Sequence, residues 1–316
     1  MILKKFYLFL FLFVSTALFA QKQITGQLKP KGDYKTILMY KTEGAFQYYK
    51  ASAKVDENGL FGFKLPENFQ KGSYKLVYEA QKDLAVNIIY NNKDISLAFN
   101  PEDVINSIFF YESENNTLLY DYVKTISTEY DELNTIQKKY YIDNSKELAR
   151  KYNSKLAKIK VYQNYFDKQA KGKIAQHFIR AFPKPISETP LNSLVEKLDF
   201  LKKNYLNNIN FQDSTLRNSA LLIDRLNEYI FDLNEAMAKK KNQAIDLNMV
   251  DVALSKIADS KFKNEVVYSL TSSAFDPYSS TYDNLLDHLF RNYYTKLAEE
   301  AKNKKFTLMV QAKLNA

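Results

Sequence analysis

The chain has 316 residues, with 45 lysines and arginines against 36 acidic residues and a formal net charge of +9. Cysteine is absent, which excludes disulfide bonds, thiolate nucleophiles and cysteine-ligated metals within this sequence. Only seven glycines are present, and none forms a glycine-rich phosphate loop. The length allows two domains with separate hydrophobic cores. Basic residues are interspersed with acidic ones, so the charge favours solubility over a polyanionic partner, and we predict no nucleic-acid binding.

The first twenty residues have the pattern of a secretory signal peptide. Lys4 and Lys5 form a short basic start, an apolar run covers residues 6–14, and small residues lead to Ala20. We therefore predict that residues 1–20 are a signal peptide cleaved after Ala20, and that the mature protein is exported and spans no membrane. The alternative is an uncleaved membrane anchor, for which the apolar run is short.

From residue 22 to residue 111 the apolar pattern has a period of two, which is typical of β-strands. The clearest unit is a predicted hairpin, with strands over residues 45–55 and 60–65 joined by a tight turn at residues 56–59 that contains Asn-Gly. The other predicted strands cover residues 24–28, 36–40, 74–78, 84–90, 95–99 and 108–111. Seven or eight short strands with turns between them predict an antiparallel β-sandwich or small barrel, and we favour the sandwich.

From residue 113 to residue 316 the period becomes that of helices, so the expected fold class is α+β, with an all-helical second domain. Ser113 or Asn116 can cap a long helix, and a second long helix follows a break at Asp143 and Asn144. Two such helices predict an antiparallel helical hairpin. Further helices are predicted over residues 173–182, which Pro183 ends, then over 191–205, 213–233, 247–257, 262–274 and 285–297. Residues 307–314 carry no turn or cap signal.

The two histidines are the candidates for an imidazole base or a metal ligand. His177 lies on a short predicted helix near Arg180, and His288 follows more than a hundred residues later. Either role requires a second partner, and neither histidine has another histidine four residues away. We interpret both as structural or surface residues, and we assign no catalytic, cofactor-binding or metal-binding residue.

Paired charges and tyrosine doublets are the remaining candidates. Asp131-Glu132 and Glu299-Glu300 are adjacent acids on predicted helices, so their side chains point in different directions and cannot converge on one substrate atom. Lysine runs at residues 239–241 and 302–305 lie near helix ends, which favours solvated turns over a nucleic-acid site. The tyrosine doublets are residues 48–49, 140–141 and 293–294. They could form a surface that binds a glycan or a protein, but their placement on apolar stripes favours packing in cores.

The order of these segments resembles a known family. The resemblance rests on a leader ending in Leu18-Phe19-Ala20-Gln21, then Ile24-Thr25-Gly26, a turn over residues 55–61, and a strand that begins at Gly72-Ser73-Tyr74, all before the helices. This order is similar to the N-terminal region of TlpA/ResA-like envelope thioredoxin-family proteins of Gram-negative bacteria. In that family a β-sandwich domain of unknown function and a helical region precede a thiol–disulfide oxidoreductase domain. The stretches 176–181 and 204–211 resemble the same helical region, so the resemblance extends over the whole chain.

This sequence departs from the family at the catalytic motif. It contains neither the Cys-x-x-Cys pair nor the Gly-x-x-Ala-Pro type of lead-in that the resemblance implies. We therefore expect a periplasmic or envelope protein that is not itself an enzyme and needs no cofactor, acting as the non-catalytic N-terminal portion of such an oxidoreductase, in positioning or protein interaction. The alternative is an independent envelope module that binds a protein or a glycan. A cysteine-free hydrolase ranks last, because no nucleophile–base pair is evident.

Overall fold

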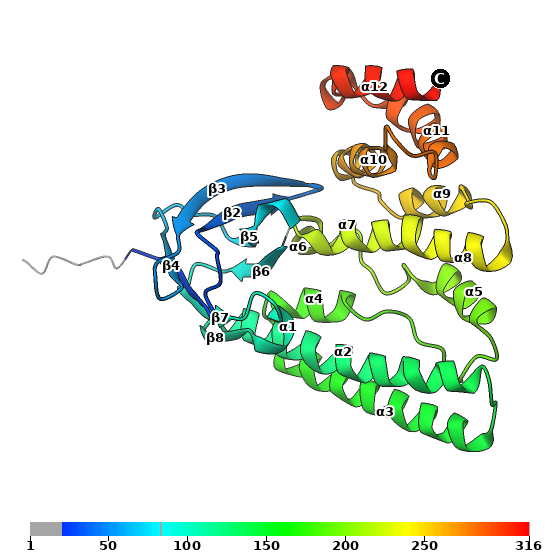
Figure 1. Ribbon diagram of the computed structural model, residues 1–316, viewed down its shortest axis with the longest axis horizontal. Coiled ribbons are helices and arrows are strands. Elements are labelled where there is room, and N and C mark those ends of the chain that lie inside the picture. Colours follow the sequence, from blue (N-terminus) through cyan, green and yellow to red (C-terminus); the bar gives the residue numbers. More distant parts are fainter. Residues whose placement is uncertain (1–20, 83, 316) are drawn as a thin grey trace, which may run out of the picture.

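Strands come first and helices second in the computed structural model, which describes residues 21–82 and 84–315 (Figure 1). The predicted signal peptide lies outside the described residues. One sheet has the order β4-β1-β7-β8 and the other has the order β3-β2-β5-β6. The strands are β1 (Gln23–Leu28), β2 (Thr36–Glu43), β3 (Phe46–Lys54), β4 (Leu60–Lys64), β5 (Gly72–Glu79), β6 (Leu84–Tyr90), β7 (Ile95–Phe99) and β8 (Phe109–Glu112). The α+β fold class is confirmed.

The two sheets share one hydrophobic core. Ile24 and Leu97 of the first sheet and Leu76 and Ile88 of the second are almost completely buried in the same cluster. This is the sandwich that the period of two predicted, because alternate residues of a strand point to the same face.

The predicted hairpin over residues 45–65 is wrong in its pairing. β3 pairs with β2 in one sheet, whereas β4 pairs with β1 in the other. The turn itself forms: the Asp56 carboxylate accepts hydrogen bonds from the backbone N–H groups of Asn58 and Leu60, both at 2.8 Å, and Gly59 has φ +78°. The turn therefore connects a strand of one sheet to a strand of the other. Turn residues reverse the chain direction locally, but they do not determine which strands pair with each other.

The sandwich is also not entirely antiparallel. β1 and β7 run parallel, with Ile24 opposite Ile95 and Leu28 opposite Phe99. The other strand pairs of the described chain are antiparallel. A parallel pair requires a long connection, and here the chain traverses the whole second sheet between β1 and β7. Alternating apolar residues predict a strand but not its direction relative to a distant neighbour.

The helices follow in two groups (Figure 1). The first group, which we call the hairpin arm, consists of α2 (Glu114–Tyr140), α3 (Lys146–Gln169) and α4 (Ala175–Ala181). The second, the C-terminal arm, consists of α5 (Leu194–Asn204), α6 (Ser214–Arg217), α7 (Ala220–Asn227), a π-helix (Glu228–Leu233), α8 (Asn234–Lys241), α9 (Asn248–Ser255), α10 (Ser260–Ala274), α11 (Asp283–Asn292) and α12 (Lys304–Leu314). Short helical turns occur at α1 (Val104–Ser107), Ala80–Lys82, Tyr294–Lys296 and Glu299–Ala301.

Local signals explain several helix ends, although the side chain of Ser113 at the start of α2 makes no capping hydrogen bond. The predicted antiparallel hairpin forms from α2 and α3, and Gly172 follows α3 with φ +74°. α5 begins later than predicted, because Ser193 caps it by accepting a hydrogen bond from the Glu196 N–H at 3.1 Å. The predicted helix over residues 285–297 ends at Asn292. α12 was missed, although Asn303 caps it by accepting a hydrogen bond from the Phe306 N–H at 3.0 Å.

Each helical arm contains a hydrophobic core, and α4 contributes to both of them, with Ile179 in the core of the hairpin arm and Phe178 in that of the C-terminal arm. The sandwich contacts both arms. Tyr122 and Ile126 are buried in the hairpin arm, whereas Leu226 and Leu254 are buried in the C-terminal arm. Asn116 of α2 bonds to both backbone groups of Ile89 in β6, at 2.7 and 2.9 Å. On the other side, the tip of the β2–β3 hairpin bonds to the C-terminal arm through two contacts. They are Gly44 N–H to Asn218 Oδ1 at 3.2 Å and Ala45 N–H to Glu265 Oε2 at 3.3 Å.

Candidate binding cleft

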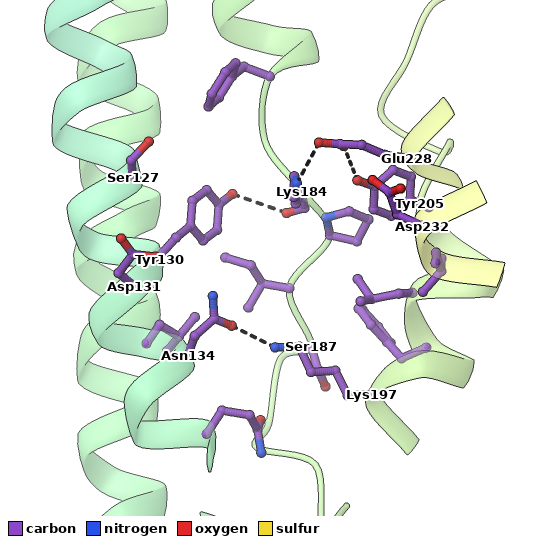
Figure 2. A pocket seen from close by; sticks show the side chains of 18 of the residues that line it. Ser127, Tyr130, Asp131, Asn134, Lys184, Ser187, Lys197, Tyr205, Glu228 and Asp232 are labelled. Atoms are coloured by element: carbon purple, nitrogen blue, oxygen red, sulfur yellow. Dashed lines mark hydrogen bonds and ion pairs between the residues drawn. The ribbon is translucent and has the colours of Figure 1, made fainter. Parts of the chain in front are cut away.

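A cleft of about 650 Å³ lies between the two helical arms. One wall is the face of α2 that carries Tyr130 and Asn134, and the other is formed by α5, α7 and the π-helix. Figure 2 shows the extended segment of residues 182–191, which links the two arms, running between these walls. The cleft therefore lies at the boundary between the two helical arms.

A buried arginine organises one side of the cleft. Arg225 of α7 is 4% exposed, and it donates to the backbone carbonyl of Phe182, to Glu228 Oε2 at 3.1 Å and to the Tyr205 hydroxyl at 3.4 Å. Its guanidinium also lies over the rings of Phe182 and Tyr205. Lys184 reaches the same carboxylate, with Nζ 3.0 Å from Glu228 Oε1. This network ties the linking segment to the C-terminal arm.

The pKa values in this network follow from burial and pairing. Burial raises the pKa of the Glu228 carboxyl, but hydrogen bonds from Tyr205 and Lys184 outweigh it and the net pKa is lowered. Burial and the same carboxylate raise the pKa of Tyr205 well above its usual range. Glu228 is therefore a fixed anion and Tyr205 a fixed neutral donor at neutral pH, which suits a structural bridge.

The π-helix helps to form this wall. It continues the rod of α7 into α8, and Glu228 and Asp232 line the cleft while Tyr229, Ile230 and Leu233 are buried. These buried residues agree with the helix predicted over residues 213–233. The change from α-helix to π-helix was not predicted, because the apolar pattern of the sequence does not indicate it. Single π turns within α-helices are rare and frequently occur at functional sites.

Side chains of the hairpin arm form hydrogen bonds with the backbone of the linking segment. The hydroxyls of Tyr130 and Tyr152 donate to the carbonyls of Lys184, at 3.2 Å, and Ser187, at 2.9 Å. Gln137 is buried and bonds to both backbone groups of Leu191, at 2.7 and 3.1 Å. Burial raises the pKa of both tyrosines to about 12, so both stay protonated donors. These polar groups are missed by a search for apolar stripes.

Lys197 of α5 reaches across the cleft to α2. Its Nζ donates to the side-chain carbonyl of Asn134 at 2.7 Å, and both residues line the cavity. Burial and the nearby positive charge of Lys138 lower the pKa of Lys197. Among the described residues no carboxylate forms an ion pair with it, unlike Arg225 and Lys184.

His177 lies outside this cleft and has an acidic partner. Its Nδ1 is 2.5 Å from Asp213 Oδ2, and both residues line a second cavity of about 390 Å³ together with Arg180. Asp213 also caps α6 by accepting from the Thr215 N–H at 2.8 Å. A helix starting at residue 213 was predicted from sequence, but the contact of Asp213 with a histidine 36 residues earlier was not, because it depends on how α4 packs against α6.

His288 belongs to a third group, at which an acid, a hydroxyl and an imidazole meet. His288 Nε2 is 2.8 Å from Asp251 Oδ1, and the Tyr293 hydroxyl donates to the same oxygen at 2.6 Å. Burial raises the pKa of Asp251, but hydrogen bonds from Tyr293 and His288 outweigh it and lower the net value. The hydroxyl bonds to the carboxylate and not to the imidazole, so this geometry lacks the nucleophile–base contact of a hydrolase. These residues do not line the main cleft.

The paired acids diverge, as their spacing on a helix predicted. Asp131 lines the cleft, whereas Glu132 bonds to Lys155 of α3. Glu299 pairs with Lys302 at 2.8 Å within a short 3₁₀ turn. In the lysine run 239–241, Lys239 pairs with Glu235 and Lys241 with Asp199.

The tyrosine doublets behave in two ways. In the helical region Tyr294 is fully buried, and the other three tyrosines of the doublets are half-buried. This agrees with the prediction that they pack in or against hydrophobic cores. The interpretation is wrong for Tyr48 and Tyr49, which are 47% and 56% exposed on β3. β3 is an edge strand, and a register shift in its pairing with β2 between Met39 and Tyr40 breaks the regular alternation at this point.

No helix in the described part of the chain has both the length and the hydropathy that a bilayer crossing requires. Comparison of the chain with models of protein families, with curated proteins and with solved structures gave no match. The chemistry of the cleft is therefore inferred from the geometry of its own residues.

Proposed function

We propose that this chain is a non-catalytic module of the bacterial cell envelope, and that it is the N-terminal portion of a thioredoxin-like thiol–disulfide oxidoreductase, acting in positioning or protein interaction. Support comes from the order of leader, strands and helices, and from a sequence without cysteine. Thiol chemistry needs a thiolate, so the redox step belongs to a separate domain.

The observation that carries this proposal is the way in which the sandwich holds both helical arms. Asn116 connects β6 to the hairpin arm, and Asn218 and Glu265 connect the β2–β3 tip to the C-terminal arm. Phe46 at that tip also packs against Tyr268, with ring centroids 5.8 Å apart. A sandwich joined at two separate points restricts rotation of the helices, and a module of this kind can hold a tethered domain at a defined distance.

Two measurements test the proposal. In an insulin reduction assay with dithiothreitol, the purified chain is expected to leave the rate at the uncatalysed value, and a rate above it would overturn the non-catalytic role. In cells that express the gene, mass spectrometry of the periplasmic fraction is expected to find a mature N-terminus at Gln21. Recovery of the intact leader in the cytosol would contradict export.

The cleft favours a second candidate, an independent binding module for a protein or glycan. Its volume of about 650 Å³ falls within the range of about 300–1,000 Å³ that is usual for ligand pockets. Aromatic side chains of Tyr130, Tyr152 and Phe200 line it beside charged groups. Binding to this cleft by the isolated chain, without any redox domain, distinguishes this candidate from the first.

A further inference from the structure

We infer that the cleft binds a ligand with a single carboxylate and an apolar body, and that Lys197 and Asn134 hold the carboxylate. This inference rests on the second candidate function, in which the cleft is a binding site. It adds the chemical class of the ligand and the residues that recognise it.

The geometry supplies hydrogen-bond donors from both walls of the cleft. Lys197 comes from α5 and Asn134 from α2, and their side chains meet with Nζ and Oδ1 2.7 Å apart (Figure 2). A lysine ammonium has three N–H donors, and this contact uses one of them. The Asn134 carbonyl is occupied by the contact, so the two N–H donors of the same amide remain. The N–H donors that remain on the Lys197 ammonium and the Asn134 amide favour a ligand with oxygen atoms that accept hydrogen bonds.

The electrostatics favour an anion at this point. The other two cations of the cleft, Arg225 and Lys184, share the carboxylate of Glu228, whereas Lys197 has a neutral amide as its partner. A half-buried ammonium that forms no ion pair loses hydration and gains little in return. A bound carboxylate offsets this cost, because charge-assisted hydrogen bonds are about twice as strong as neutral ones.

Acidic residues nearby limit how much negative charge the ligand carries. Asp131 lies one helical turn before Asn134 on α2, and Asp232 lies on the π-helix, and both line the cleft. Glu196, next to Lys197 in sequence, accepts from the backbone N–H of Asn192 at 2.8 Å. These carboxylates repel phosphates and other multiply charged ligands, so the site is suited to one negative charge.

The surroundings of Lys197 are suited to an apolar body. Phe200 and Leu201 follow it by three and four positions on α5, and therefore lie on the same helix face. Ile186 and Pro185 of the linking segment also line the cavity. A hydrocarbon chain or an aromatic ring attached to the carboxylate can pack against these groups, as in most small-molecule sites.

The experiment uses 4-phenylbutanoate as the probe and 4-phenylbutanamide as its neutral analogue, with glucuronate as a polar carboxylate. Binding to the full chain is followed by calorimetry and by the NMR signal of the Ile186 δ-methyl group, with exposed Ile142 as a remote control. The expected result is that 4-phenylbutanoate shifts the Ile186 signal and binds at least tenfold more tightly than the amide or glucuronate.

The variants separate the role of the charge from the stability of the fold. Lys197→Met is expected to weaken 4-phenylbutanoate binding roughly tenfold to a hundredfold and to leave binding of the amide unchanged. Lys203→Met is the control, because Lys203 is an exposed lysine on the same helix that does not line the cavity. The wild-type chain supplies an independent readout: a bound carboxylate favours the charged ammonium and should raise the pKa of Lys197, so that calorimetry over an alkaline pH series should find proton uptake on binding as the pH approaches the pKa of Lys197 in the free protein.

The outcomes distinguish the two levels of the proposal. If the acid and the amide bind equally at Ile186, and no proton is taken up, the cleft is a binding site but the carboxylate inference is wrong. Tight binding of glucuronate would overturn the requirement for an apolar body. If no probe shifts the Ile186 signal at millimolar concentration, both the inference and the binding role of the cleft fail, whereas the positioning role proposed first is untouched.

Discussion

The sandwich and the helical domain bury their apolar residues in different ways. Two sheets enclose one core in the sandwich, whereas the helices form two cores with a polar cleft between them. Burial of apolar surface therefore holds each unit together, and Phe178 and Ala181 of α4 extend the core of the C-terminal arm into the hairpin arm. Around the cleft, the contact between the helical arms depends on directed polar groups such as Arg225 and Gln137. The boundary between two cores is a place where a protein can place charged groups and a cavity without disrupting either core.

The largest expected effects come from the two helical cores, and they test whether these cores are separate. Ile126→Ala in α2 and Leu226→Ala in α7 each remove a fully buried side chain and should each cost about 2–5 kcal/mol. Hydrogen exchange followed by mass spectrometry should show the greater loss of protection in the arm that carries the substitution. Val161→Ala, at an exposed position on α3, is the control. Equal loss in both arms would show a single cooperative core.

Arg225→Met tests the polar bridge between the arms. The substitution keeps much of the apolar stem but removes the charged donor to the Phe182 carbonyl and one of the three partners of Glu228, so we expect a loss of roughly 3 kcal/mol in chemical denaturation. The control is Arg150→Met, at an exposed arginine of α3, which should change stability by less than about 0.5 kcal/mol. If Arg225→Met left the stability unchanged, the linking segment would be held by its tyrosine and glutamine contacts alone.

Asn116→Ala tests the contact between the sandwich and the hairpin arm. It removes both hydrogen bonds to Ile89 in a site with no exposed surface, and each buried group left unsatisfied costs about 1–3 kcal/mol. We expect a loss of about 2 kcal/mol in denaturant unfolding, with Asn144→Ala at an exposed turn as the control. If the two variants were equally stable, the attachment of the sandwich to the helices would depend on the other contact, at the β2–β3 tip.

The smallest expected effect concerns pH. Burial raises the pKa of Glu129 in α2, but hydrogen bonds from Lys155 and Lys158 of α3 outweigh it and the net pKa is lowered. When the pKa of a carboxyl is lower in the folded state than in the unfolded state, its ionised form stabilises the fold at any pH above the unfolded-state pKa. This stabilisation is lost as the pH falls through the folded-state pKa. Glu129→Gln should cost roughly 1 kcal/mol at pH 7, and its deficit should shrink between about pH 5 and pH 3. A deficit independent of pH would point to packing instead.

Much of the local structure was predictable from the sequence. The strands up to β8, the α2–α3 hairpin and the buried stripe from Leu222 to Leu233 all follow from apolar periods of two or 3.6 residues. The helix start predicted at residue 213 also agrees with the structure, where Asp213 caps α6. α12 was missed because Asn303 lies within the lysine-rich stretch 302–305, which we interpreted as a solvated turn.

The candidate site was not predictable in the same way. Asn134 and Lys197 are 63 residues apart, Tyr152 and Ser187 are 35 apart, and Arg225 meets a carbonyl 43 residues earlier. No pattern of sequence spacing relates such residues, because each contact depends on how whole helices pack.

The sequence by itself determined where the chain extends, coils and turns, and which faces of each element are apolar. The tertiary structure alone decided that β3 and β4 join different sheets, that β1 and β7 run parallel, and that a cleft opens between the helical arms. The physical reason is range: strand and helix preferences act between residues a few positions apart, whereas sheet partners and cavities depend on the burial of surfaces that are distant in the chain.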